Sequence, residues 1–381
     1  MCPRVPCYNR GMRIAFLGQK SLILGKKGGG IETHVANLAP RLVARGHEVT
    51  AYARKRYSEE HPTYHEGVRV RYLPTIYAKN LEAIVHTFLA TIDICFRKVD
   101  VIHYHGVGPA LMCWIPRLLR PRVTVVGTFH AQDQYHQKWS WFARFMLRLG
   151  ERATCKIPHA TITVSHGLQV VCRDEYDSEA VFIPNGADRK TVRKQDQLVQ
   201  FGLNKGEYIL TVGRLLPVKG IHHLIKAFRR TKTRKQLAVV GAPALGDGYL
   251  DELKQLAKGD DRVQFLGFQS GDTLEQLFAH AYLYCQPSES EGLPLTVLEA
   301  MSFGTAVLVS EIPGNLEAIH RAGFTFENKD VDDLTQQLQH LFKHPDEVTR
   351  ARGDVKRVVE KHFAWDRIVE RTLEVYRSAR H

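Results

Sequence analysis

Short apolar runs alternate with segments of helical apolar spacing along most of the chain. Each run is typical of a strand that is buried on both faces of a sheet. The segments between them place apolar residues three and four positions apart, as in Ile31, Val35 and Leu38. This alternation predicts an α/β fold, with parallel sheets covered by helices on both faces. The predicted strands are residues 12–18, 48–52, 68–73, 101–104, 123–126, 160–164, 237–240, 263–266, 282–285 and 305–309, together with the stretch 207–214, a strand that runs into a loop.

A length of 381 residues predicts two domains. The first is expected at residues 1–187, of which residues 1–11 show no periodicity and look like an extension. The polar stretch 188–206 is the predicted linker, and the second domain follows at 207–363. Residues 364–381 are expected to form a final helix. Its apolar face consists of Trp365, Ile368, Leu373 and Tyr376.

Two glutamates eight residues apart, Glu291 and Glu299, are the most informative polar positions. The apolar spacing after Leu293 predicts a helix that begins near that residue and carries Glu299 about two turns along it, with Glu291 in the preceding loop. A carboxylate accepts two hydroxyl hydrogen bonds, which suits a vicinal diol. Two such carboxylates, with an anion between them at the helix N-terminus, fit a nucleotide sugar. A glutamate at a helix start also serves as an ordinary cap, and this alternative stays open.

Two cations lie at the carboxyl end of the predicted strand in residues 207–214. Arg214 and Lys219 lie in the loop after it, where ligands bind at the carboxyl edge of a parallel sheet. A guanidinium and an ammonium that converge there would neutralise a diphosphate. The alternative is a pair of solvated charges in an exposed loop.

Two features of the first half are further candidate ligand contacts. Gly28-Gly29-Gly30 precedes a predicted helix, and its backbone amides can approach a phosphate closely. The spacing is not that of a dinucleotide-binding loop, and a flexible turn is the alternative. His130 follows a predicted strand and should lie at its carboxyl end, facing the cleft.

Together, Arg214 with Lys219 and Glu291 with Glu299 resemble the donor site of the retaining glycosyltransferases of the glycogen-synthase-like group, glycosyltransferase family 4. The resemblance runs from Met12 to the C-terminus and is most specific over residues 205–320. It implies the GT-B fold, two Rossmann-like domains facing each other across a cleft, with a C-terminal helix that crosses back to the first domain. It also implies front-face transfer of a sugar from a nucleotide diphosphate sugar, in which the departing phosphate accepts the acceptor's proton.

The resemblance assigns roles residue by residue. Catalytic roles are implied for His130, Glu291, Arg214 and Lys219. Donor contacts are implied for Gly29, Gly30, Arg214, Lys219, Gly292, Leu293, Leu295, Thr296 and Glu299. The acceptor is expected beside Glu32, His105 and Asp133. No metal ion or other cofactor is expected to be required, because the cationic side chains offset the charge of the departing phosphate.

Residues 128–151 also resemble bacterial glycosyltransferases that build surface polysaccharides. Pro294 departs from the pattern, since many relatives have glycine there. Proline has no amide hydrogen, so one backbone donor is absent. The donor base, the sugar, the acceptor, its linkage and the oligomeric state are not predicted.

Composition narrows the setting. Seven scattered cysteines without a C-x-x-C pair argue against a disulfide framework and a structural zinc site, and they favour a reducing, cytoplasmic location. The chain shows neither an apolar stretch of about 18 residues nor a secretion-signal pattern.

The net charge of +13 is concentrated in the first half. Residues 1–190 hold 27 Lys and Arg against 15 Asp and Glu, which leaves +1 for the rest. This excess fits an anionic acceptor or the anionic inner face of the cell membrane, and nucleic acid is not expected because no recognised module accompanies the charge. The helical pattern in residues 78–98 has an apolar face that either packs on its own sheet or contacts a membrane.

Three functions fit this sequence. The favoured one is a retaining hexosyltransferase with a glycan or lipid-linked acceptor. The second is a nucleotide-sugar epimerase on the same fold. The third is a non-catalytic module that binds a nucleotide sugar, which the complete set of donor-site charges disfavours.

Overall fold

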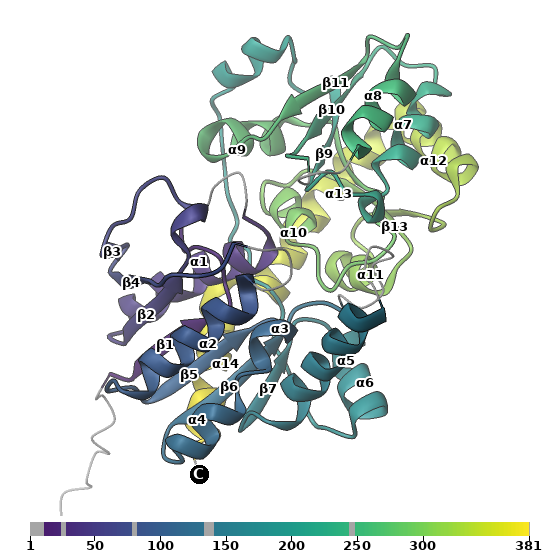
Figure 1. Ribbon diagram of the computed structural model, residues 1–381. Helices are drawn as coiled ribbons and strands as arrows, with labels where there is room; N and C mark the ends of the chain where they lie inside the picture. The colour runs from purple at the N-terminus through teal and green to yellow at the C-terminus, as the bar shows by residue number, and fades with distance from the viewer. Residues whose placement is uncertain (1–10, 24–27, 78–81, 133–140, 244–247, 381) are drawn as a thin grey trace, which may run out of the picture.

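The computed structural model describes residues 11–23, 28–77, 82–132, 141–243 and 248–380, without the side chains of residues 141–144. Within this part of the chain, two separate sheets have eight and six strands (Figure 1). Their strand orders are β3-β4-β2-β1-β5-β6-β7-β8 and β11-β10-β9-β12-β13-β14. Neighbouring strands are parallel, except that β3 pairs antiparallel with β4. The predicted α/β class with two Rossmann-like domains is therefore confirmed.

The first sheet lies in the lower half of Figure 1. Its strands are β1 (Arg13–Leu17), β2 (Glu48–Ala53), β3 (Tyr64–His65), β4 (Val68–Tyr72), β5 (Val101–His105), β6 (Thr124–Phe129), β7 (Ala160–Thr163) and β8 (Val181–Phe182). Its helices are α1 (Gly30–Ala44), α2 (Glu82–Cys95), α3 (Val107–Ala110), α4 (Trp114–Leu119), α5 (Trp141–Lys156) and α6 (His166–Tyr176).

Side chains alternate between two cores along the central strand of this sheet. Ile14 and Phe16 of β1 face the core formed with α1 and the C-terminal helix, whereas Ala15 and Leu17 face the core formed with α2 and α3. This period of two follows from strand geometry. Both faces of the sheet are thus buried, as the continuous apolar runs predict.

The second sheet has its own strands and helices in the upper half of Figure 1. The strands are β9 (Tyr208–Val212), β10 (Gln236–Val240), β11 (Val263–Gly267), β12 (Leu283–Gln286), β13 (Val307–Ser310) and β14 (Phe324–Phe326). The helices are α7 (Ile221–Arg229), α8 (Tyr249–Ala257), α9 (Gly271–His280), α10 (Leu295–Ser302), α11 (Pro313–Ile319), α12 (Val331–Lys343) and α13 (Pro345–Val358).

Residues 188–206 connect the two sheets and pack on the second one. A 3₁₀ turn, Asp196–Phe201, lies against α9, and Leu198 and Leu203 are buried in the core. The Gln197 amide donates to Gln276 Oε1 at 2.9 Å. The segment expected as a polar linker is therefore docked on the second domain through two leucines.

The chain ends by returning to the first sheet. A π-helical turn, Val359–Phe363, separates α13 from α14 (Trp365–Ser378), which appears in yellow beside the first domain in Figure 1. Trp365 packs directly on Gly186, where a Cβ would lie 2.3 Å from the indole ring. Arg45 of α1 pairs with Asp366 at 2.6 Å and Glu370 at 3.0 Å. The predicted return of the C-terminal helix is confirmed.

Candidate functional site

The donor-side cations lie at the carboxyl end of β9. Arg214 is exposed in the loop after the strand, and Lys219 ends a 3₁₀ turn, Pro217–Lys219. Lys219 Nζ lies 2.5 Å from Glu291 Oε1, and the two side chains are 23% and 12% exposed. The structure thus joins the predicted phosphate cation directly to the predicted sugar carboxylate.

Two further residues hold Glu291 in place. Its Oε1 also accepts hydrogen bonds from Gln286 Nε2 at 2.9 Å and Ser288 Oγ at 2.7 Å. Tyr284 OH and Thr296 Oγ1 in turn donate to Gln286 Oε1. The sequence analysis did not predict this network. Tyr284 and Gln286 of β12 and Ser288 just after it are two residues apart, which is the period of a strand. The carboxylate is therefore preorganised by groups that are themselves hydrogen-bonded.

Glu299 lies closer to the helix start than the sequence predicts. Pro294 has extended backbone angles (φ −73°, ψ 107°) and acts as the N-cap, so α10 begins at Leu295 and not near Leu293. Glu299 is its fifth residue, about one turn in rather than two. Partial burial raises the pKa of Glu299 to about 7, with Lys190 opposing this shift and Glu275 adding to it. A carboxyl that titrates near neutral pH is thus placed on the donor side.

Donor-side backbone meets the first domain directly. Asn185 Nδ2 donates to the Leu293 carbonyl at 3.0 Å, and Asn185 Oδ1 lies 3.0 Å from His34 Nδ1. The Leu295 side chain lies 3.6 Å from a Cβ built on Gly30. Asn185 and His34 were not predicted as site residues. The predicted glycine loop and the start of α10 are therefore brought together across the domain boundary.

His130 lies at this boundary as predicted. It follows β6 and is half-buried, and His105 Nδ1 lies 3.2 Å from its Nε2. Burial lowers the pKa of His130 well below its ordinary value, and positive charge on His34 or His103 would lower it further. His130 is therefore a neutral imidazole at pH 7, suited to hydrogen bonding rather than to charge pairing.

His105, expected beside the acceptor, is the last residue of β5. The side chain is fully buried on the central strand β5, with the His103 ring 4.1 Å away and the Phe16 ring 5.0 Å away. Its Nε2 finds no hydrogen-bond partner among the described residues. His105 supports His130 from behind.

Glu32 has a local structural contact. The side chain is buried in the first turn of α1, and its Oε1 accepts a hydrogen bond from the Lys20 amide at 2.9 Å. Burial is the main cause that lowers the pKa of Lys20; Glu32 opposes this shift and Arg214 adds to it. Lys20, a third cation that the sequence analysis missed, therefore lies near Arg214 from the opposite domain. Asp133, the remaining predicted acceptor-side residue, lies outside the described residues.

Gly292 is needed where the domains touch. A Cβ at this position would lie 2.1 Å from the His130 carbonyl oxygen, which is backbone that cannot turn away. The neighbouring Gly314 approaches the Gly292 carbonyl in the same way, at 2.4 Å. Only glycine permits this approach between the donor loop and the strand-end histidine.

Gly292→Ala should lower kcat for transfer by about tenfold, because the added methyl group separates the donor loop from His130. Steady-state transfer assays and thermal unfolding of the same preparations measure this. Gly353→Ala is the matched control, since a Cβ there meets nothing within 4 Å. Wild-type activity of well-folded Gly292→Ala would show that this close approach is not used.

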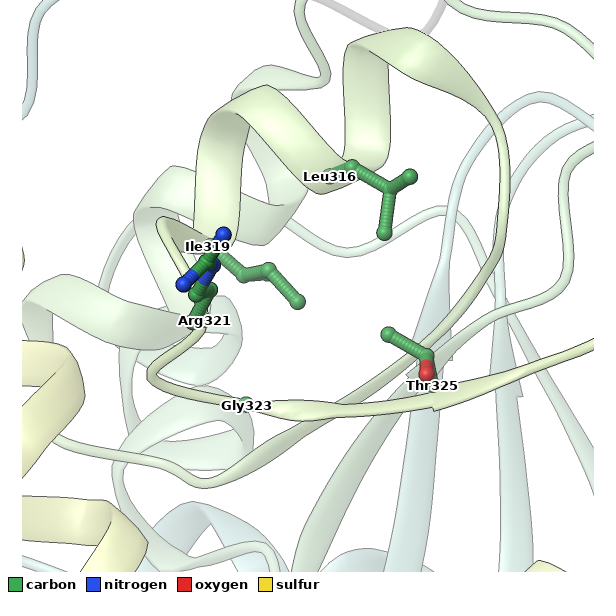
Figure 2. A pocket seen from close by; sticks show the side chains of 5 residues that line it. All are labelled: Leu316, Ile319, Arg321, Gly323 and Thr325. Carbon is green, nitrogen blue, oxygen red and sulfur yellow. The ribbon is translucent and has the colours of Figure 1, made fainter.

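A cavity of about 410 Å³ lies elsewhere, between α11 and β14 (Figure 2). It is lined by Leu316, Ile319, Arg321, Gly323 and Thr325. A single cation without a carboxylate offers no match for a diphosphate and two diols. We therefore place the candidate site at the domain boundary and not in this cavity.

Comparisons with known proteins agree with this geometry. The family model described as "Glycosyltransferase Family 4" matches residues 28–191, and the one described as "Glycosyl transferases group 1" matches residues 193–357. The chain belongs to the family 4 glycosyltransferases. The two matches meet at residue 192, inside the segment that connects the two sheets.

Relatives of this glycosyltransferase span nearly the whole chain. An uncharacterised glycosyltransferase of Methanocaldococcus jannaschii is 28% identical over 92% of this chain and 95% of its own length. A D-inositol 3-phosphate glycosyltransferase of Arthrobacter is 27% identical over 96% of this chain and 95% of its own. The crystal structure of Anabaena Alr3699/HepE with UDP and glucose has a TM-score of 0.80 at 20% identity, covering 96% of this chain and all of that one. That last similarity confirms the GT-B fold.

Proposed function

We propose that this glycosyltransferase moves a hexose from a nucleoside diphosphate sugar to its acceptor with retention of the anomeric configuration. The observation that supports this most is the contact of Lys219 with Glu291, whose loop and the following helix α10 lie against His130 and Gly30 of the other domain. The named ligands of Alr3699/HepE, UDP and glucose, are of the same chemical class.

Each donor-side group has a distinct role in this proposal. Arg214 and Lys219 neutralise the diphosphate, together with the backbone amides at the start of α10. Glu291 orients the sugar hydroxyls and Glu299 accepts from the ribose diol. His130, neutral and supported by His105, donates or accepts a hydrogen bond with the transferred sugar.

The transfer itself needs no nucleophilic side chain. The acceptor hydroxyl attacks the anomeric carbon from the face that the diphosphate leaves, and the bond between that carbon and the phosphate oxygen breaks. The departing phosphate takes the hydroxyl proton. The cations stabilise the charge that develops on the phosphate, so a metal ion is not required for this step.

Product analysis tests the reaction. The nucleotide sugar that most raises the melting temperature is chosen first, since a ligand of the folded state stabilises it. Incubation with that donor and an acceptor should give a glycosylated product with the donor's anomeric configuration. A free or epimerised sugar formed without any acceptor would indicate an epimerase. Donor binding without turnover would indicate a binding module.

The acceptor is proposed to be anionic or held at an anionic membrane. The first half carries nearly all of the net charge, and the Arthrobacter relative is named for an anionic acceptor, D-inositol 3-phosphate. A lipid-linked phosphate sugar in a surface-polysaccharide route fits both observations. Catalysis would then take place in the cytoplasm, at the inner face of the cell membrane.

One surface of the first domain suits such a membrane. Phe96 after α2 is 85% exposed, and Trp114 and Leu118 on α4 are 52% and 72% exposed. We call these three residues the apolar tip. Exposed basic side chains lie close to these residues along the chain, namely Arg97, Lys98, Arg117 and Arg122. Exposed apolar side chains beside basic ones match an interfacial contact with anionic lipid.

Helix α2 leads into Phe96. It buries His86, Thr87 and Ala90 against the sheet, whereas Phe88 of its predicted apolar face is 44% exposed. Residues 78–81 of the predicted segment lie outside the described residues. No helix among the described residues has the length and apolar character needed to cross a bilayer. The proposed contact is therefore peripheral.

Vesicle sedimentation checks this contact. The protein should bind anionic vesicles at low salt and dissociate as salt rises, because exposed charges are screened beyond roughly 8 Å at physiological salt. Leu118→Asp should weaken binding at least fivefold by removing apolar insertion. Val199→Asp, which alters a residue 76% exposed in the connecting segment, is the control. Equal binding by both variants, or none to anionic vesicles at low salt, would remove the membrane from the proposal.

A further inference from the structure

A second group of potential ligands lies behind the donor loop. His222 and His223 are the second and third residues of α7, and Glu289 lies in the loop after β12. His223 Nε2 is 3.2 Å from Glu289 Oε1, and His222 Nε2 is 4.0 Å from the same oxygen. The three ligand atoms all lie within 4.8 Å of one another.

We propose that His222, His223 and Glu289 bind one transition-metal ion of the zinc class. Two imidazole nitrogens and one carboxylate oxygen form a common zinc donor set, whereas magnesium and calcium prefer oxygen alone. Tetrahedral bonds of about 2.0–2.1 Å place ligand atoms roughly 3.4 Å apart. The His223–Glu289 separation of 3.2 Å is close to this value, and the His222–Glu289 separation of 4.0 Å would shorten when an ion binds. Each of the three side chains is also partly exposed, which leaves a path for the ion and for a water ligand.

A hydrogen bond to Tyr249 orients the His222 ring for metal coordination. His222 Nδ1 lies 2.7 Å from the hydroxyl of the buried Tyr249, so a proton on Nδ1 leaves the Nε2 lone pair facing Glu289. Such an outer partner is typical of a metal-bound histidine, because it fixes the tautomer and the ring.

Lys329 is the competing cation. Its Nζ lies 3.0 Å from Glu289 Oε2, which is the other oxygen from the one that faces the histidines. A metal ion on Oε1 therefore does not require this ion pair to break. The nearby ammonium does repel the ion, so removal of the Lys329 charge should tighten metal binding.

The position links this site to the donor residues. The Glu289 amide donates to the Val218 carbonyl at 2.8 Å, next to Lys219 and two residues before Glu291. Gly220, which precedes α7, approaches the Pro287 carbonyl so closely that a Cβ would lie 1.8 Å from it. A metal ion would thus join the two segments that hold Lys219 and Glu291, and its role would be to position them rather than to contact the donor.

The other group of at least three such side chains with ligand atoms this close, among the described residues, is a weaker metal site. His34, His105 and His130 also have ligand atoms within 4.8 Å of one another. His105 Nδ1 and His130 Nε2 are already engaged with each other at 3.2 Å, and His34 Nδ1 lies 3.0 Å from Asn185 Oδ1. That group also lacks a carboxylate, which would balance the charge of a divalent ion.

Titration of the chelator-treated full chain with Co²⁺, followed by Zn²⁺ competition, tests the proposal. Wild-type protein should bind one ion at this site and show the visible absorption of four-coordinate cobalt. His223→Ala and Glu289→Gln should each weaken binding at least tenfold, and Lys329→Gln should tighten it severalfold. Zn²⁺ should raise the melting temperature of wild type and not that of His223→Ala.

His340→Ala is the matched control. His340 lies 3.0 Å from Glu347 and its ring lies 4.4 Å from that of His344, so it belongs to another exposed histidine and glutamate group. This variant should bind cobalt as wild type does. Loss of binding in His340→Ala, or undiminished binding in His223→Ala together with no gain in Lys329→Gln, would overturn the proposal. The readout is metal binding, so its failure leaves the proposed transfer reaction unaffected.

Discussion

Lys219→Ala should lower kcat/KM for sugar transfer by about 10²–10³-fold, because one charge-stabilising group at the departing phosphate is lost. The affinity for the free nucleoside diphosphate should fall as well. Lys219 is 23% exposed and ends a short 3₁₀ turn, so its removal should change the melting temperature little. Calorimetric titration with UDP, ADP and GDP, combined with transfer kinetics, measures both effects.

Lys226→Ala is the control for lost positive charge. Lys226 is exposed on α7, seven residues further along the same segment. This variant should bind and transfer as wild type does. If well-folded Lys219→Ala keeps its diphosphate affinity, the assignment of this lysine to the phosphate is wrong.

The ion pair of Lys219 with Glu291 explains why both residues matter before a donor arrives. Their 2.5 Å contact keeps the ammonium at the carboxyl end of β9 and within the network of Gln286 and Ser288. In our proposal the diphosphate of a bound donor pairs with the Lys219 ammonium in place of Glu291, and the Glu291 carboxylate becomes available to the sugar hydroxyls. The ligand-free chain therefore holds both groups near their working positions, which lowers the cost of ordering them on binding.

The fold follows closely from the hydrophobic pattern. The predicted strand 48–52 is observed as β2, and 237–240 is observed within β10. The predicted strand ends are wrong where neighbouring strands, rather than the local sequence, determine how far a strand extends. β6 continues three residues beyond the predicted end at residue 126, because Gly127 and Thr128 lie between β5 and β7 and complete their ladders. The short strands β3, β8 and β14 carry too few residues for a period to be seen.

The candidate site was less predictable because burial is a tertiary property. Spacing placed Glu291 and Lys219 in loops after strands, and the structure brings them into contact. The family resemblance placed His105 beside the acceptor, and in the structure its side chain is fully buried, with the Phe16 ring of β1 5.0 Å away. Gln286 and Ser288 have ordinary polar side chains, and only the three-dimensional contact with Glu291 shows their role.

Glu291→Gln and Glu299→Gln should separate the sugar end of the donor from the ribose end. Glu299→Gln should weaken both the nucleoside diphosphate and the nucleotide sugar about tenfold, since both contain ribose and a hydrogen bond to a charged group is lost. Glu291→Gln should slow transfer by about 10²-fold and leave diphosphate affinity unchanged or tighter, because Lys219 loses its carboxylate partner. Calorimetry with both ligands decides this. Equal losses on both ligands in both variants would mean that the carboxylates are wrongly assigned.

The titration of Glu299 gives this assignment a second, independent test. Its pKa in the folded chain is about 7, above the ordinary value of 4.5, so folding favours the protonated form. The resulting penalty on stability is absent below pH 4.5, grows as the pH rises toward 7 and is constant above that. Glu299→Gln should therefore melt at a higher temperature than wild type at pH 8 and at a similar temperature near pH 5.

The pH dependence of diphosphate binding should also report the Glu299 carboxyl. Here ionisation of Glu299 should favour binding, whereas it lowers the stability of the fold. The ionised carboxylate accepts both ribose hydroxyls, so diphosphate affinity should rise from pH 6 to 8 in wild type and more weakly in Glu299→Gln. The phosphate itself titrates near pH 6 and contributes equally to both. Glu275→Gln should move the midpoint of the binding profile to lower pH than in wild type, because Glu275 raises the pKa of Glu299. Glu275 also pairs with Lys190 at 2.6 Å, and its loss frees Lys190 to lower the pKa of Glu299. Identical pH profiles for all three proteins would place the ribose away from Glu299.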